Sequence, residues 1–329
     1  MHDDGSTAAR PSVDRTRPLG VLAGFDGSDQ AQRALLYAAR AAQRLDVRLT
    51  VVTAYTVPAL AYSDASQIPT VPAEVARLSA AQDVLDAANA LLDGYPGEVD
   101  LRTEHGDAAG VLVRLSEQAV LAVVGARGRG GFFGRLLGSV SSALPAHAHC
   151  PTVVVPRGYE VDAGEGASRF RPIDSDTPVV MGTDRSPRSR AALDVAVQAA
   201  LARQAPLHLL LAMTLPDAWG ASYMAWLPDP DILERQRTQL AAELEEDAAA
   251  LREAHPGLVV TSEAVLAEPV GTLIEHSRSA QLVVLGTRGH GRVASTLLGS
   301  VSQAVLQRAE GPVMVVPDGL EDAEEAPAS

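Results

Sequence analysis

The sequence contains one pattern twice, and this internal duplication constrains the fold more than any other feature. Residues 24–28 (GFDGS) recur as residues 182–186 (GTDRS), an offset of 158 residues. Farther along the chain, residues 137–141 (LGSVS) recur unchanged as residues 298–302, an offset of 161 residues. Because matching blocks follow in the same order, the chain consists of two homologous units in tandem, each of about 140 residues.

Composition marks the boundaries of the two units. Residues 1–17 form a polar arm, which we expect to be flexible, and residues 18–156 form the first domain. Residues 157–176 are a linker containing Gly, Asp, Glu and Ser, and residues 177–317 form the second domain. The tail, 318–329, carries acidic residues and no basic one, so we expect it to be disordered.

Strands and helices alternate within each predicted unit. Strands are expected at 19–24, 49–54, 99–104, 121–124 and 152–155, and again from near Pro178 and at 207–212, 259–264, 282–285 and 313–316. Helices are expected after Ser28 and Ser186, at 73–92, 110–118, 231–255 and 271–279, and from Ser139 and Ser300. Continuous apolar strands are typical of parallel sheets buried on both faces. The alternation predicts an α/β fold with two Rossmann-like doubly wound domains, each with a five-stranded parallel sheet.

The first predicted strand of each unit leads into an acidic turn. The residues concerned are Gly24, Asp26 and Ser28, and in the second unit Gly182, Asp184 and Ser186. Ser28 and Ser186 are predicted N-caps, the second with Pro187 at the first helical position, where a missing N–H costs nothing. Ligands of doubly wound sheets bind beyond the carboxyl ends of the strands, so Asp26 and Asp184 are candidate contacts.

A glycine-rich loop follows the fourth predicted strand in both units. It has the pattern G-x2-G-x9-G-S, formed by Gly125, Gly128, Gly138 and Ser139, and again by Gly286, Gly289, Gly299 and Ser300. Further glycines inside the loops are Gly130, Gly131 and Gly291. Because glycine has no Cβ, such a loop lets backbone amides approach a ligand closely.

The Gly-Ser pair at the end of each loop opens a predicted helix. The first N–H groups of a helix have no partner within it, and the helix dipole favours negative charge there. We therefore predict that a phosphate chain binds at these helix starts, with the hydroxyls of Ser139 and Ser141 as additional donors. Arg127 and Arg288 are the nearest cations in the sequence.

The chain contains no lysine, since all 27 basic residues are arginine. This excludes a Walker P-loop, whose lysine contacts the phosphates, and any enzyme that forms a Schiff base through lysine. The dinucleotide fingerprint G-x-G-x-x-G is rejected as well. The first unit has Phe133 in place of the third glycine, the second has Ala294, and both loops follow a fourth strand instead of a first.

The net charge and the cysteine content limit which binding partners and which cellular compartment we expect. With 41 acidic residues the formal net charge is −14, which argues against nucleic acid as the main partner. The single cysteine, Cys150, excludes an intrachain disulfide and favours a reducing compartment. The N-terminal residues lack the apolar core of a signal peptide, and no apolar run reaches the ~18–20 residues that cross a bilayer. We expect a cytoplasmic protein without a membrane segment.

Several candidate residues also have a plainer interpretation. The glycines could serve only a tight strand–helix turn, and Asp26 could stabilise the helix start alone. His147, His149 and Cys150 offer zinc ligands, but the second unit lacks their equivalents, so packing of Cys150 is the simpler interpretation. His290 is interpreted as a phosphate contact in preference to a catalytic base.

In these motifs the sequence resembles the universal stress proteins, as a tandem of two domains of their ATP-binding subgroup. The resemblance covers residues 19–156 and 178–317 and implies ATP as the ligand, with Mg²⁺ as a potential companion. It implies adenine near Ala54 and Ala212, and ribose near Asp26 and Asp184. The implied phosphate contacts are Gly125, Arg127, Gly128, Gly130, Gly131, Gly138, Ser139, Val140 and Ser141, and Gly286, Arg288, Gly289, His290, Gly291, Gly299, Ser300, Val301 and Ser302.

The resemblance implies a regulatory or nucleotide-sensing role in a stress response. We find no general base matched to the phosphates and no acidic pair for Mg²⁺, so any hydrolysis is expected to be slow. No catalytic residue and no resident metal site is assigned. Two alternatives remain open: a slow ATP-hydrolysing or phosphoryl-transferring enzyme, and an interaction scaffold with a structural nucleotide.

The fifth predicted strands, 152–155 and 313–316, are apolar and lie at a sheet edge in this fold. An exposed apolar edge favours pairing with another strand. We therefore expect the two units to pair with each other within the chain, and we also expect a homodimer.

Overall fold

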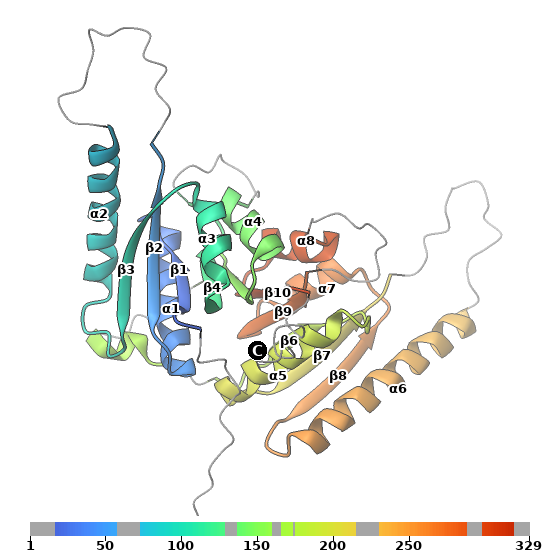
Figure 1. The fold of residues 1–329 in the computed structure, drawn as a ribbon. Coiled ribbons are helices and arrows are strands. Elements are labelled where there is room, and N and C mark those ends of the chain that lie inside the picture. The colour runs from blue at the N-terminus through green and yellow to red at the C-terminus, as the bar shows by residue number, and fades with distance from the viewer. Residues whose placement is uncertain are drawn as a thin grey trace, which may run out of the picture.

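The computed structural model describes residues 17–57, 73–128, 137–159, 166–173, 175–214, 230–287 and 298–318. Nearly all of the predicted arm and tail, and most of both glycine-rich loops, lie outside these ranges. Within the described part, the same alternating series of strands and helices occurs in each half of the chain, as the sequence predicts (Figure 1). None of the described helices combines the length and apolarity that a membrane span requires.

The first half forms a parallel sheet of five strands. Its elements are β1 (Gly20–Gly24), α1 (Asp29–Leu45), β2 (Leu49–Tyr55), α2 (Ala73–Leu91), β3 (Val99–His105), α3 (Ala108–Ser116), β4 (Ala119–Gly125), α4 (Ser139–His147) and β5 (Thr152–Val155). The strand order is β3-β2-β1-β4-β5. The direction of winding therefore reverses between β1 and β4, and this is the place where doubly wound sheets bind their ligands.

The second half repeats this arrangement. A short 3₁₀ helix, η1 (Gly166–Phe170), precedes it, and its elements are β6 (Val179–Gly182), α5 (Ser189–Arg203), β7 (Leu207–Ala212), α6 (Pro230–Ala254), β8 (Val260–Val265), α7 (Pro269–His276), β9 (Leu282–Gly286), α8 (Ser300–Arg308) and β10 (Val313–Val316). The strand order β10-β9-β6-β7-β8 mirrors the first half. The duplicated α/β architecture is therefore confirmed.

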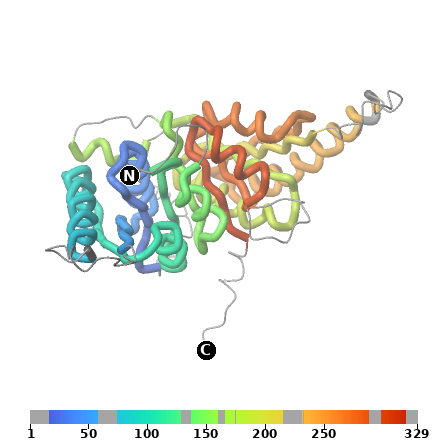
Figure 2. The backbone as a smooth tube through the Cα atoms, turned by 90° about the horizontal axis from the view of Figure 1, so that it is seen from above, coloured from blue at the N-terminus to red at the C-terminus, as the bar shows by residue number. Residues whose placement is uncertain are grey.

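The two halves share one ten-stranded sheet, because β5 and β10 pair antiparallel at its centre. Val154 lies opposite Val313, and Val153 lies opposite Met314. All three of the side chains Val153, Val154 and Val313 are buried. Figure 2 shows the two halves side by side, from blue to green and from yellow to red. The predicted pairing of the two units within the chain is confirmed.

Helices cover both faces of this sheet in two layers. Helices α1, α2, α5 and α6 pack on one face through a cluster that includes Leu35, Leu85 and Leu244. Helices α3, α4, α7 and α8 pack on the other face through a cluster that includes Leu112 and Leu144. Burial on both faces explains why the strands are apolar runs without polar alternation.

The start of α1 agrees with the sequence, whereas the start of α5 does not. Ser28 caps α1, and its side chain accepts a hydrogen bond from the amide of Ala31 at 3.2 Å. The prediction that Ser186 caps α5 is wrong, because this helix begins at Ser189. The Ser186 carbonyl accepts hydrogen bonds from the amide of Ser189, at 2.9 Å, and from its hydroxyl, at 2.7 Å. These bonds close a turn around Pro187 before the helix begins.

The linker between the halves packs on the first half. The Arg169 guanidinium donates to the carbonyls of Leu91, at 2.7 Å, and Asp93, at 3.1 Å. Phe170 is fully buried and meets the ring of Tyr95 edge to face, with the centroids 5.2 Å apart. The sequence alone did not single out this anchor, because Phe170 stands in a polar segment without periodicity.

Candidate functional site

In the first half, the structure brings Asp26 and Gly128 together at the carboxyl ends of β1 and β4. The Asp26 carboxylate accepts a hydrogen bond from the amide of Ser28 at 3.0 Å, which fixes its orientation. A Cβ placed on Gly128 would lie 2.3 Å from Asp26 Oδ2, so the carboxylate could keep this position only beside a glycine. Two residues predicted to contact a ligand are therefore neighbours, although more than 100 residues separate them in the chain.

The end of β4 is held against the first turn of α1 by Gln30, which the sequence analysis did not single out. The amide of Arg127 donates to Gln30 Oε1 at 3.2 Å. A Cβ on Gly125 would lie 2.9 Å from the backbone oxygen of Gln30, so Gly125 permits this close approach. This explanation of Gly125 concerns packing and requires no ligand.

Helix α4 presents its N-terminus to the same crevice. Gly138 is the N-cap, and having no side chain it forms no side-chain cap to the first amides of this helix. The Gly138 amide donates to the carbonyl of Ala126 at 3.0 Å, which ties the helix start to the end of β4. Ser139, the first helical residue, is exposed. The first amides of a helix have no partner within it, and together with the helix dipole they make this end suitable for an anion.

The two serines at the start of α4 have different surroundings. The Ser141 side chain is buried, and its hydroxyl donates to the carbonyl of Ala126 at 2.7 Å. In the second half, the Ser302 hydroxyl donates to the carbonyl of Gly286 at 2.8 Å. Ser141 and Ser302 thus hold the helix to the strand, whereas Ser139 and Ser300 stand exposed. Val140 and Val301 pack at the margin of the apolar cluster beneath.

The crevice of the second half repeats this backbone but differs in its side chains. The Asp184 carboxylate accepts a hydrogen bond from the amide of Ser186 at 3.0 Å, and the amide of Gly299 donates to the carbonyl of Thr287 at 2.7 Å. Arg185 stands where the first half has Gly27, and both have a positive φ, 58° and 79°. The Thr287 hydroxyl also donates to Asp318 at 2.8 Å.

Arg185 is held by two carboxylates of α6. Its Nε donates to Asp247 at 2.8 Å, and a second guanidinium nitrogen pairs with Glu243. These partners raise the pKa of Arg185 above its ordinary value, with the hydrogen bond that it donates to Asp247 as the largest cause. The guanidinium of Arg185, the residue that follows Asp184, is therefore already paired within the protein.

The remaining predicted contacts fall into three groups. Ala54 and Ala212 lie half-buried at the carboxyl ends of β2 and β7. Gly24 and Gly182 are explained by packing, since a Cβ on Gly24 would lie 2.8 Å from Leu112 and one on Gly182 would lie 2.6 Å from Leu285. Six further predicted contacts lie outside the described residues: Gly130, Gly131, Arg288, Gly289, His290 and Gly291.

A cavity of about 740 Å³ opens beside Arg127 at the junction of the halves. Its lining includes arginines from both halves, together with Glu310; these arginines are Arg40, Arg44, Arg127, Arg157, Arg203 and Arg278. In a chain of net charge −14, this grouping makes the surroundings of Arg127 locally basic.

The alternative zinc site at Cys150 receives no support from the geometry. Cys150 is fully buried, and burial raises the pKa of its thiol to about 12. Zinc binds cysteine as the thiolate, which this environment disfavours. The interpretation of Cys150 as a packed residue before β5 is confirmed.

The family model described as the universal stress protein family matches residues 20–156 and 177–317. Universal stress protein Rv2623 of Mycobacterium tuberculosis is 34% identical over 313 residues, covering 92% of this chain and 97% of its own length. Universal stress protein Rv1996 of the same organism is 33% identical and covers 90% and 94%. A crystal structure of a universal stress protein from Archaeoglobus fulgidus shares the fold, with a TM-score of 0.60 at 18% identity, covering 92% and 97% of the two chains.

Two matches of one family model, in tandem, agree with the duplicated sheet and with the repeated glycine motif. The relatives align over nearly their whole length, so the similarity extends to the entire two-domain arrangement. The chain belongs to the universal stress protein family.

Proposed function

We propose that the chain binds ATP in the crevice between β1 and β4, and that it acts as a regulatory nucleotide sensor in a stress response. One observation carries this proposal: the Asp26 carboxylate, the backbone of Gly128 and the start of α4 converge at the point where the strand order reverses. A carboxylate suits ribose hydroxyls, and bare amides suit phosphates.

The residues present fit this ligand. The Asp26 carboxylate lies directly against the backbone of Gly128, and the N-cap of α4 is Gly138, which has no side chain to cap the first amides of the helix. Asp26 would hold the ribose, Ala54 would lie against adenine, and Arg127 would add positive charge near the phosphates. Ser139 is the exposed hydroxyl at the helix start, so it is the proposed donor, whereas Ser141 braces the helix. Mg²⁺, where bound, would neutralise part of the phosphate charge.

A second, weaker ATP site in the second half is part of the proposal. The paired guanidinium of Arg185 and the bond between Thr287 and Asp318 support a lower affinity there. An arginine stands at the position of Gly27, and its charge is compensated by Glu243 and Asp247 of α6.

The hydrogen bond that the Asp26 carboxylate already accepts favours a sensor over an enzyme. This bond comes from a backbone amide and commits one oxygen of the carboxylate to holding the turn. Turnover of ATP by the full chain distinguishes the two functions. We expect less than about one turnover per minute, against the ~10 per second typical of enzymes; a rate near the typical value would establish the enzyme instead.

The site assignment is tested by Gly138→Val. A Cβ at Gly138 meets Ser141 Oγ at 3.3 Å and Arg127 Cα at 3.5 Å, so a small adjustment accommodates it in the free protein. The valine side chain would still stand where phosphate is proposed to lie. We expect titration calorimetry to show an ATP affinity at least about 10-fold lower, which is 1.4 kcal/mol.

The matched control is Gly257→Val, where a Cβ meets no atom within 4 Å. This variant should bind ATP like the original chain, and both variants should keep its unfolding midpoint within a few degrees. Unchanged affinity in a folded Gly138→Val protein would refute the assignment of the phosphate site.

A further inference from the structure

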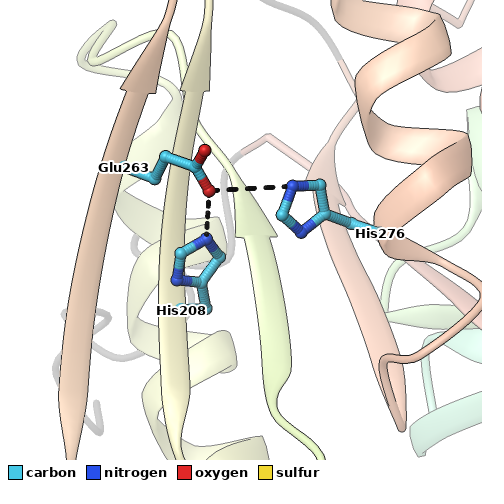
Figure 3. A group of neighbouring side chains, drawn as sticks. All are labelled: His208, Glu263 and His276. Atoms are coloured by element: carbon cyan, nitrogen blue, oxygen red, sulfur yellow. Dashed lines mark hydrogen bonds and ion pairs between the residues drawn. The ribbon is translucent and has the colours of Figure 1, made fainter.

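Two histidines and a glutamate meet in the second half, away from the proposed nucleotide crevice. His208 lies on β7, Glu263 on the edge strand β8, and His276 is the last residue of α7 (Figure 3). The Nε2 atom of His208 lies 3.2 Å from Glu263 Oε2, and Nε2 of His276 lies 3.8 Å from the same oxygen. One nitrogen or oxygen atom from each of the three residues lies within 4.8 Å of the others.

The fold does not require these residues, as the first half shows. From the strand registers and the repeat offset, the equivalent positions hold Thr50, Arg102 and Leu115. Thr50 donates a hydrogen bond to the carbonyl of Leu19 at 2.8 Å, and Arg102 pairs with Asp100. The same framework is thus stable with a hydroxyl, an arginine and an apolar side chain, so the second half carries its ligand-type residues for another reason.

The position of His208 suits a metal ligand. Its Nδ1 lies 2.8 Å from the Thr261 hydroxyl, an outer contact that fixes the ring with Nε2 toward Glu263. An imidazole binds a metal ion through the lone pair of one ring nitrogen, and the contact of Nδ1 with Thr261 leaves Nε2 of His208 for this role.

We propose that His208, Glu263 and His276 bind one divalent transition metal ion, zinc by the type of its ligands. Two imidazoles and one carboxylate form a known zinc set, with water at the fourth position. At zinc–ligand distances of ~2.0–2.1 Å, tetrahedral ligand atoms stand about 3.4 Å apart. The two distances to Glu263 are already near this value, and the two histidines must approach each other.

Binding changes the rings in a defined way. The imidazoles of His208 and His276 now stack with their centroids 5.4 Å apart and their planes at 16°. A metal ion lies in the plane of each imidazole that binds it, so the ring of His276 must rotate out of this stack while Thr261 holds that of His208. The ion would join β7, the edge strand β8 and the end of α7, and it would therefore stabilise the second half against unfolding.

The test is a zinc titration of the untagged full chain after treatment with chelator, using competition with a chromogenic chelator. We expect one site per chain, and a higher unfolding midpoint with zinc. His208→Thr and His276→Leu introduce the residues of the first half, so the framework tolerates them. Each should lower the zinc affinity at least about 10-fold, as should Glu263→Gln.

The matched control is His149→Ala. His149 Nε2 lies 3.5 Å from Glu117 Oε1 in an exposed pair beside the buried Cys150. This pair also offers an imidazole and a carboxylate, but it lacks the second histidine of the proposed site. Its removal should leave zinc binding unchanged. The proposal is overturned if the original chain binds no zinc at millimolar concentration, if folded His208→Thr protein binds it equally well, or if His149→Ala loses it. ATP binding plays no part in these results, so they stand apart from the nucleotide proposal.

Discussion

Residue types and spacing predict much of the candidate site, but they do not show which way each side chain points. The glycine spacing identified Gly128, and the acidic turn identified Asp26, which the structure places in contact range of each other. The sequence treated Ser139 and Ser141 as equal phosphate donors. Helix geometry separates them, because residues two apart on a helix face different directions, and Ser141 turns inward to Ala126.

This difference between the two serines gives a prediction at the residue scale. Ser141→Ala removes a buried hydrogen bond and leaves the carbonyl of Ala126 with one partner fewer, so we expect a loss of stability of about 1–2 kcal/mol. Ser139→Ala removes an exposed hydroxyl, so we expect unchanged stability and weaker ATP binding. Urea unfolding and ATP titration of both variants check this. The opposite pattern would mean that Ser141 is the phosphate donor.

At the scale of elements, apolar runs and glycines predict most ends of strands and helices closely. Two helix starts that the sequence analysis placed wrongly are fixed by a side-chain cap. The fifth strands and the starts of α4 and α8 agree with the sequence to the residue. Helices α3 and α7 were predicted from Gly110 and Gly271 but begin two residues earlier. Asp107 and Glu268 cap them through the amides of Gly110 and Gly271, and the sequence analysis did not use these caps.

The cap of α3 gives a prediction at this scale. Asp107 accepts a hydrogen bond from the amide of Gly110 at 3.0 Å. We expect Asp107→Ala to lower the free energy of unfolding by about 1 kcal/mol, the usual value for an N-cap. Asp83→Ala, on the exposed side of α2, is the control and should change stability by less than about 0.5 kcal/mol. Equal effects of both variants in urea unfolding would show that the cap contributes nothing.

At the scale of the whole molecule, the junction of β5 and β10 makes two repeated halves into one sheet. The apolar fifth strands predict this pairing, since an unpaired apolar edge is unfavourable in water. The expectation of a homodimer rested on the exposed edges of these same strands, which now pair with each other within the chain. A homodimer would therefore need another surface, and it stays a prediction. The position of the linker was not predictable, because one buried ring, Phe170, anchors it.

The junction predicts how the chain unfolds. Met314 is 5% exposed on β10, opposite Val153 of β5. Met314→Glu would bury a carboxylate there, at a cost of several kcal/mol, and we expect calorimetry to resolve separate unfolding of the halves. Val259→Glu, at a position 63% exposed, should unfold like the original chain. A Met314→Glu protein with the unfolding curve of the original chain would show that the junction does not couple the halves.

The central claim is that the crevice between β1 and β4 holds ATP through backbone amides and Asp26. The most direct measurement is a crystal structure of the full chain grown with ATP. We expect the triphosphate between Gly128 and the first amides of α4, with the ribose at Asp26. A nucleotide bound elsewhere, or this crevice occupied only by protein or water at saturating ATP, would contradict the account.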